Sequence, residues 1–343
     1  MPGRAVSIPN KDESEAQVTA MTSVPTEVLT SAVELACRAP SYHNSQPWRW
    51  IMDGDGLHLY LDPSRVVQTD RQERQAVISC GAALDHLRVA MAAAGWEANI
   101  ARCPDPANDD RLASIRFTWS RAVTEEQRRR AEAIATRRTD RLPFNPVTDW
   151  SDFEAVLRNH LDDTNAVVDI ISDADRHELV QATELTDALR FYDSTYFAAL
   201  QRWTAPFEAS EGIPYDSLVS AAEGDRVDVA RTFPVSHHPE RRADVPVDLS
   251  TIVVISAHHD TRRDLLGCGE TLSAVLLDAT VAGLATCTLT HLTELETSRH
   301  LVEELTGHPL PQALVRIGRA PDHEHVPLPT PRRPLADVLT VNS

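Results

Sequence analysis

The stretches SCGAALDHLRVAMAAAGWEA (residues 79–98) and GCGETLSAVLLDATVAGLAT (residues 267–286) are two versions of one pattern. Each has a Cys-Gly pair, a leucine three residues after that glycine and a second glycine fourteen residues after it, at a constant offset of 188. Apolar residues recur at helical spacing in both, and each run ends at a glycine suited to a helix C-cap. The repeat predicts two long apolar helices at the centre of the protein and indicates an internal duplication.

Segments of alternating polarity flank both predicted helices. LHLYL (57–61) precedes the first helix and LASIRFTW (112–119) follows it, whereas STIVVISA (250–257) and ALVRIGRA (313–320) flank the second. For each half, the pattern predicts a helix, a strand, a long central helix and a further strand, which is typical of an α+β sandwich of a sheet against helices.

The domain organisation follows from the same pattern. Residues 1–24 are polar and without period, which predicts a flexible N-terminal arm. The first half is expected over residues 25–122 and the second over 123–343, because a charged helix with Thr124 as its N-cap begins near the boundary. Residues 203–248 are proline-rich and have little periodicity, so they are either a lid or arm insertion or a plain solvated loop.

Composition restricts the class of partner. The 343 residues are 42% apolar and carry a net charge of −18 without a long basic block, which argues against binding to nucleic acid or to an anionic membrane. The longest apolar run contains Asp278 and several threonines, which disfavours a membrane span. Five widely spaced cysteines and the lack of a secretory segment near Met1 favour a cytoplasmic protein with reduced thiols. No complete set of metal ligands is predicted.

Two kinds of segment suggest a ligand site. APSYHNSQPWRW (39–50) places the amides of Asn44 and Gln46 in one loop, where they suit a ring that alternates N–H and C=O groups, such as a flavin pyrimidine. The alternative is that these amides satisfy backbone groups of the loop.

The other kind is rich in arginine. IATRRTDRLPF (134–144) and PTPRRPL (329–335) could supply guanidinium groups for a phosphate, which an acidic protein must hold in a local pocket. The alternative is that an arginine run at the end of a helix is stabilised by the helix dipole alone. The candidate arginines are Arg137, Arg138, Arg141, Arg332 and Arg333.

The loop APSYHNSQPWRW resembles the ring-edge loop of the nitroreductase family of flavin mononucleotide (FMN) enzymes. IATRRTDRLPF resembles the arginine signature of that family, with Thr139 in place of the usual serine, and PTPRRPL resembles its C-terminal basic pair. The resemblance implies the nitroreductase sheet-and-helix sandwich, duplicated in one chain to mimic the homodimer of the family. It also implies that the flavin ring and ribityl chain contact Pro40, Ser41, Asn44 and Gln46, and that the phosphate end contacts Arg137, Thr139, Arg141, Arg332 and Arg333.

The first half keeps the ring-edge loop and the second half keeps the arginines, so one complete FMN site between the halves is expected and its symmetry mate should be lost. This layout resembles the mycobacterial Acg family, which is associated with dormancy. A monomer with an internal pseudo-two-fold is expected. ATCTLTHLTEL (285–295) lacks the glycine-rich stretch that faces flavin N5 in the family, which leaves Thr288 or Thr290 as candidates for that side.

The resemblance implies ping-pong chemistry, in which a nicotinamide gives hydride to flavin N5 and a nitroaromatic or quinone then receives it. Such chemistry needs no side-chain acid or base, and no catalytic residue is named. The competing hypothesis is a catalytically silent protein that stores or sequesters FMN under a lid. A third is a scaffold without a cofactor.

Overall fold

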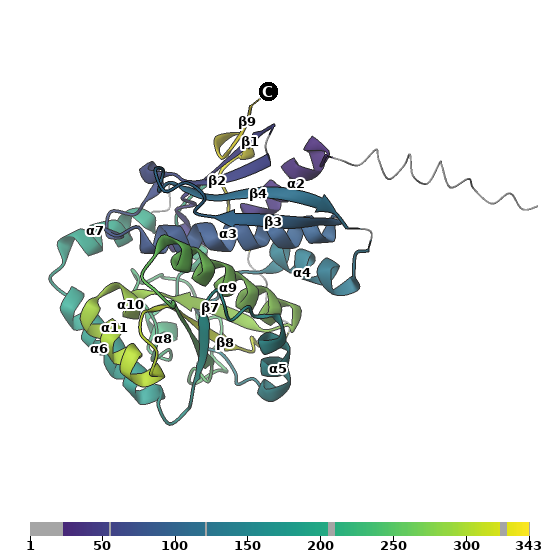
Figure 1. Cartoon of the computed structure of the whole chain (residues 1–343). Coiled ribbons are helices and arrows are strands. Elements are labelled where there is room, and N and C mark those ends of the chain that lie inside the picture. Colours follow the sequence, from purple (N-terminus) through teal and green to yellow (C-terminus); the bar gives the residue numbers. More distant parts are fainter. Residues whose placement is uncertain (1–22, 55, 121, 205–209, 323–327, 343) are drawn as a thin grey trace, which may run out of the picture.

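Two long helices lie side by side between two β-sheets, so the layers run sheet, helix, helix, sheet (Figure 1). The helices are α3 (Arg74–Ala93) and α9 (Arg262–Val281), and they lie where the repeated stretches predict them. The structure is a computed structural model that describes residues 23–54, 56–120, 122–204, 210–322 and 328–342. Most of the predicted N-terminal arm therefore lies outside the described residues. The α+β sandwich is the predicted fold class.

The first sheet has the strand order β3-β4-β2-β1-β9. Its first four strands pair antiparallel, whereas β9, which comes from the end of the chain, pairs parallel with β1. The C-terminal segment thus crosses to the sheet of the first half, where Figure 1 shows it beside β1. The strands are β1 (Trp48–Asp53), β2 (Gly56–Leu61), β3 (Trp96–Arg102), β4 (Arg111–Trp119) and β9 (Leu339–Val341).

The second sheet has the order β5-β6-β8-β7, and its strands all pair antiparallel. Strand β8 is buried along its whole length, as expected for a central strand covered on both faces. The strands are β5 (Val167–Ile171), β6 (Thr251–Ser256), β7 (Ala285–Leu289) and β8 (Pro311–Gly318). The alternating segments of the sequence thus correspond to β2, β4, β6 and β8.

Gly81 and Gly269 lie where α3 and α9 cross. A Cβ atom on Gly81 would be 2.1 Å from the carbonyl oxygen of Leu266, and one on Gly269 would be 2.0 Å from that of Ile78. The two glycines are 188 residues apart, and so are Ile78 and Leu266. Such a reciprocal contact is the pattern of a two-fold interface. The repeated Cys-Gly pair therefore marks the closest approach of the two central helices.

Most of the remaining helices pack either beside the two central helices or against the second sheet. Helix α4 begins after Thr124, whose side chain accepts a hydrogen bond from the backbone N–H of Gln127 in a capping box, as the predicted N-cap requires. The helices are α2 (Thr26–Ala36), α4 (Glu125–Thr136), α5 (Trp150–His160), α6 (Arg176–Arg190), α7 (Ser194–Trp203), α8 (Ala221–Gly224), α10 (His291–Glu294) and α11 (Glu296–Thr306).

The central helices carry the core. Their cysteines, Cys80 and Cys268, are buried, and burial raises the pKa of Cys268 to about 12, so both are packed thiols. Helix α3 is long and apolar enough to cross a membrane, but 83% of its apolar window is buried inside the protein. Its apolar surface is therefore used in packing against α9 and the first sheet.

Candidate functional site

A cavity of about 990 Å³ is lined by residues from both sides of the predicted boundary near residue 123. This volume is at the upper end of the range of about 300–1,000 Å³ for sites that enclose a small organic ligand. The loop after α2, the first turns of α3, the segment after α4 and strand β7 all contribute walls. Residues of the predicted insertion between 212 and 235, residues of the C-terminal segment between 328 and 332, and residues of α6, α9 and β8 also line the cavity.

The loop after α2 is held in an unusual backbone conformation. His43, Asn44 and Gln46 have φ values of 51°, 58° and 52°, in the left-handed region that non-glycine residues rarely adopt. The hydroxyl of Ser41 fixes this path by accepting from the backbone N–H of Gln46 at 3.0 Å. The backbone N–H of Tyr42 donates to the hydroxyl of Ser79 on α3 at 3.0 Å. Strained backbone of this kind is often found at ligand sites.

Asn44 keeps one acceptor free for a ligand. Its Nδ2 donates to the carbonyl oxygens of Gly212 (3.0 Å) and Pro331 (3.3 Å), which ties the loop to the insertion and to the C-terminal segment. Its Oδ1 is buried and has no hydrogen-bond donor within the described part of the chain. A ring N–H of a heterocyclic ligand would satisfy this atom.

Gln46 has a different role, because its amide is used within the protein. Its Nε2 donates to the carbonyl oxygens of Asn44 (3.2 Å) and Ser210 (2.8 Å), and its Oε1 accepts from the backbone N–H of Arg333 at 2.8 Å. Gln46 is fully buried and does not line the cavity. It holds the loop against the C-terminal segment.

Three arginines, Arg38, Arg137 and Arg332, meet at another part of the cavity wall. No salt bridge joins any of them to a carboxylate among the described residues. Burial and the nearby Arg38 lower the pKa of Arg137 to about 10, and burial, Arg137 and Arg38 lower that of Arg332 to about 9. Three like charges without a counter-ion indicate a site for an anion.

The hydrogen bonds of these arginines differ. Arg332 donates to the carbonyl oxygens of Cys37 and Arg38, both at 3.1 Å, at the C-terminal end of α2, where a cation is also favoured by the helix dipole. Among the described residues, the one hydrogen bond of the Arg137 side chain is a long contact of 3.4 Å to the carbonyl oxygen of Arg38. Its Nε is buried and has no acceptor within the described part of the chain. Arg137 is therefore the arginine whose unused donor best fits a phosphate oxygen.

Arg141 and Thr139 follow on the same segment. Arg141 donates to the carbonyl oxygen of Ser217 at 3.3 Å and lies over the ring of Phe233, 5.1 Å from its centroid. Thr139 forms a parallel β-bridge with Thr286, next to β7. Both residues line the cavity, as do Thr288 and Thr290 from the end of β7.

A buried ion pair forms the wall beside the loop after α2. Arg231, from the insertion, pairs with Glu294 of α10 and donates to the hydroxyls of Thr290 (3.0 Å) and Tyr196 (2.9 Å). Its guanidinium carbon is 5.6 Å from the centroid of Tyr42. Burial alone would raise the pKa of Glu294, but the charge of Arg231 outweighs it and lowers this pKa to about 2.

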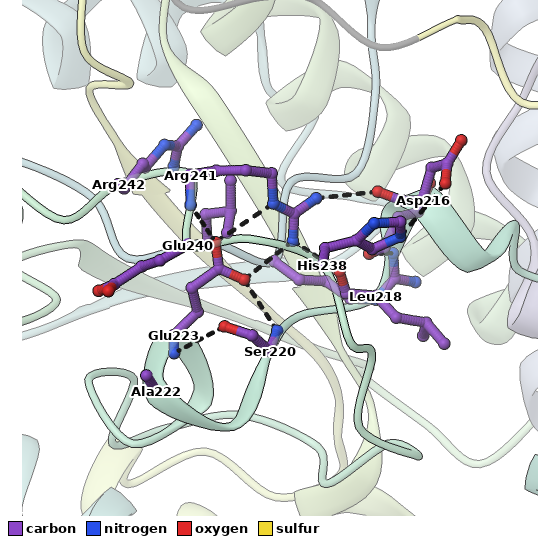
Figure 2. A network of polar contacts seen from close by, with 12 residues as sticks. Asp216, Leu218, Ser220, Ala222, Glu223, His238, Glu240, Arg241 and Arg242 are labelled. Carbon is purple, nitrogen blue, oxygen red and sulfur yellow. Dashed lines mark hydrogen bonds and ion pairs between the residues drawn. The ribbon is translucent and has the colours of Figure 1, made fainter.

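The part of the insertion that the structure describes from residue 210 onward has its own network of polar contacts. Figure 2 shows the guanidinium of Arg241 against the carboxylate of Glu223 and the carbonyl oxygens of Asp216 and Leu218. Its two contacts with Glu223 are 3.1 and 3.2 Å long. Glu223 is fully buried and also caps α8 through Ser220. These contacts lower the pKa of Glu223 to about 2 despite its burial. The segment that lines the cavity is thus held by ionic contacts within the insertion.

Eight of the ten predicted site residues come together around the cavity. Gln46 and Arg333 do not line it, because they support the loop from behind. Sequence reasoning missed Arg38, Arg231 and Phe233. Arg38 directly precedes the quoted loop, and this adjacency could have identified it. The other two lie in the insertion, where no pattern indicated a role. The lining residues from the prediction are Pro40, Ser41, Asn44, Arg137, Thr139, Arg141, Thr288 and Arg332.

The position related to Ser79 by the 188-residue offset is filled. Ser79 lines the cavity, whereas a Cβ on its counterpart Gly267 would lie 2.7 Å from the carbonyl oxygen of Asn165. The loop before β5 therefore packs against α9 where the ring-edge loop packs against α3.

Comparison with known proteins places the chain. No family model matches it. It is 54% identical over 324 residues to the protein of Mycobacterium tuberculosis named "Putative NAD(P)H nitroreductase acg". The aligned residues cover 94% of this chain and 98% of that protein. A second protein of the same species, whose name states no function, is 51% identical and covers 92% of this chain and 93% of its own length.

Solved structures give weaker matches. The FMN-dependent nitroreductase NfnB of Mycobacterium smegmatis, crystallised with NADPH, matches 64% of this chain and 100% of its own with a TM-score of 0.41 and 17% identity. A structure described as a nitroreductase of Anabaena variabilis has a TM-score of 0.45 and 10% identity, and the match covers 89% of this chain and 91% of its own. The assignment therefore rests on the sequence relatives: the chain belongs to the Acg family of nitroreductase-like proteins.

Proposed function

We propose that the chain binds one FMN in the cavity between its halves and uses it for NAD(P)H-dependent reduction of a nitroaromatic or a quinone. The observation that carries this proposal is a set of three arginines that have no carboxylate partner among the described residues: Arg38, Arg137 and Arg332. Their cavity also contains Oδ1 of Asn44, which has no donor in the described part of the chain. A phosphate would supply the missing negative charge, and a flavin ring would supply the missing N–H group.

Each residue type fits one part of FMN. Arg137 offers an unused Nε donor to the phosphate, and Arg38 and Arg332 add charge. Ser41 and Asn44 would hold the ring edge, and Thr288 or Thr290 would face the remaining side. Bound FMN would supply hydride transfer from a nicotinamide to the acceptor, so the protein has only to orient the ring and keep one face accessible.

One FMN per chain is expected, because the loop that contains Asn165 fills the position equivalent to Ser79. A second FMN would also lack the three arginines. The reciprocal contact of α3 and α9 uses the surface through which two separate halves would dimerise, which supports the prediction of a monomer. A cytoplasmic location and the link to dormancy stay predictions.

A second candidate function is storage of FMN without turnover. It is favoured by the insertion, whose carbonyl oxygens at Ser210 and Gly212 accept from Gln46 and Asn44 and whose residues form much of the cavity wall. An insertion held this firmly would keep a nicotinamide from stacking on the ring while leaving FMN bound.

Anaerobic mixing of the FMN-loaded full chain with excess NADH or NADPH separates the two functions. The absorbance of the oxidised flavin is followed, and dithionite is added at the end to show that the bound flavin can be reduced. Bleaching by a nicotinamide supports the reductase. Bleaching by dithionite alone contradicts the reductase and supports storage. A protein that neither retains FMN nor melts at a higher temperature in its presence would refute both functions.

A further inference from the structure

The two charged walls of the cavity differ in a way that bears on the oxidation state of the flavin. We propose that Glu294 cancels the charge of Arg231 beside the ring and thereby keeps the reduction potential of the bound flavin lower than an unpaired Arg231 would set it. This inference rests on the proposed function, because it places the flavin ring beside the loop that contains Asn44.

Arg231 is the cation of the wall beside the ring. It lines the cavity, and its guanidinium lies over Tyr42 of the ring-edge loop, 5.6 Å from the ring centroid. Its side chain is 6% exposed, so water screens its charge little. A cation at this place would stabilise any negative charge that develops on the flavin ring.

Glu294 removes most of this effect. Its two carboxylate oxygens contact both terminal nitrogens of Arg231, and its side chain is 9% exposed. The hydroxyl of Thr290 donates to the carboxylate at 2.8 Å, which fixes the pair. Arg190 lies farther away, 3.8 Å from Glu294, and is itself paired with Asp193 at 2.8 Å. The pair of Arg231 and Glu294 therefore presents almost no net charge to the cavity.

The arginines at the phosphate end differ from Arg231 in that their charges are not balanced by a neighbouring carboxylate among the described residues. Arg38, Arg137 and Arg332 have no carboxylate partner among the described residues, and the pKa values of Arg137 and Arg332 are lowered as a result of burial and mutual repulsion. The pair of Arg231 and Glu294 is thus balanced in charge, whereas the three arginines at the other end are not. Arg141 lies between them, since the ring of Phe233 that it covers is 6.1 Å from the ring of His43. Arg141 lies along the wall, with its face on Phe233 and a hydrogen bond to Ser217.

The oxidised and reduced forms of FMN differ in the charge of the ring. Oxidised FMN has a doubly charged phosphate and a neutral ring. Uptake of two electrons and one proton adds a negative charge to the ring and leaves the phosphate unchanged. Because Glu294 balances the charge of Arg231, this pair adds little electrostatic stabilisation to the negative charge on the reduced ring. Glu294 is therefore a positioning residue that acts through Arg231 and sets the balance between the two forms.

The test is an anaerobic redox titration of the FMN-loaded full chain against a reference dye. Glu294→Gln leaves Arg231 unpaired and should raise the affinity for reduced relative to oxidised FMN by about tenfold, which raises the two-electron potential by about 30 mV. Arg231→Gln removes the nearer cation of Glu294 and leaves Arg190 at 3.8 Å, so it should lower the potential by a similar or smaller amount. The double variant, Glu294→Gln with Arg231→Gln, should return close to the wild-type potential.

Glu270→Gln is the matched control. Glu270 of α9 is 4% exposed and pairs with Arg102 of β3 through two contacts of 2.6 and 2.7 Å. Neither residue lines the cavity, so this variant loses a similar buried pair away from it. Its flavin potential should equal that of the wild type.

The directions in which the two single variants shift the flavin potential decide whether Glu294 has this role. Equal potentials in all variants, or shifts of the same sign in both single variants, would overturn the role of Glu294 even if FMN binds. If Glu294→Gln does not fold, a lower potential in Arg231→Gln that the double variant restores still supports the role, and no restoration refutes it. A wild-type chain that binds no FMN would instead refute the proposed function, and this inference with it.

Discussion

Replacing Arg137 by methionine should stabilise the protein without ligand and weaken its binding of FMN. Arg137 is 6% exposed, and burial together with Arg38 lowers its pKa from 12.5 to about 10. A shift of this size corresponds to at most about 3 kcal/mol of unfavourable free energy in the folded state. Methionine keeps a similar length of apolar side chain and removes the charge, so we expect a gain of about 1–3 kcal/mol in the free energy of unfolding.

The pH dependence has a defined sign. A cation whose pKa is lower in the folded than in the unfolded protein carries its full cost at neutral pH, where both states are protonated. The cost falls as the pH rises above about 10, because the folded state then loses the proton first. The stability advantage of Arg137→Met should therefore be complete at neutral pH and become smaller above pH 10.

Binding should change in the opposite direction. Loss of one charge-assisted hydrogen bond to phosphate costs about 1.5–3 kcal/mol, which raises the Kd for FMN about 10- to 150-fold. Riboflavin lacks the phosphate, so its Kd should hardly change. The assay combines urea denaturation of the ligand-free protein with fluorescence titration of both flavins. Equal weakening of FMN and riboflavin, or a less stable ligand-free variant, would refute the assignment of Arg137 to a phosphate.

Three further changes test other parts of the structure. Gly81→Ala should destabilise the protein by about 1–3 kcal/mol or more in thermal unfolding, because its Cβ would lie 2.1 Å from a backbone oxygen of α9, whereas Gly54→Ala, which has no atom within 4 Å, should be nearly neutral. Glu223→Gln should make the insertion more susceptible to limited proteolysis at neutral pH. Since the pKa of Glu223 is lowered to about 2, the wild-type insertion should become susceptible only as the pH falls from about 4.5 toward 2. A variant that is cleaved at the wild-type rate at neutral pH would contradict this role of Glu223. Gln46→Leu should lower the melting temperature even without FMN, because its amide bonds join the loop to the insertion and the C-terminal segment; an unchanged melting temperature would assign Gln46 to the ligand instead.

The central helices and several strands could be predicted because each depends on a short, continuous pattern of residues. The Cys-Gly repeat requires small residues where two helices touch, and the alternating segments require one buried face of a sheet. Strand β9 could not be predicted, since Leu339–Val341 is only three residues long and its partner β1 is nearly three hundred residues away. Short strands of this kind are defined by pairing and not by their own sequence.

The residues of the candidate site likewise divide into those that a short motif predicts and those that only tertiary contacts reveal. Asn44 and Arg137 lie in short motifs whose residue types already suggest a ligand. The sequence could not distinguish Asn44, which keeps a free acceptor, from Gln46, whose amide is fully used. Arg231 and Glu294 are 63 residues apart and belong to an aperiodic segment and a short helix, so only their tertiary contact reveals the pair.

The most direct test of the account is calorimetric titration of the ligand-free full chain with FMN. The arrangement of the cavity predicts one FMN per chain and a Kd that increases strongly when Arg137 and Arg332 are both replaced by alanine. Absence of binding, two FMN per chain, or an unchanged Kd in the double variant would contradict a single FMN site between the halves.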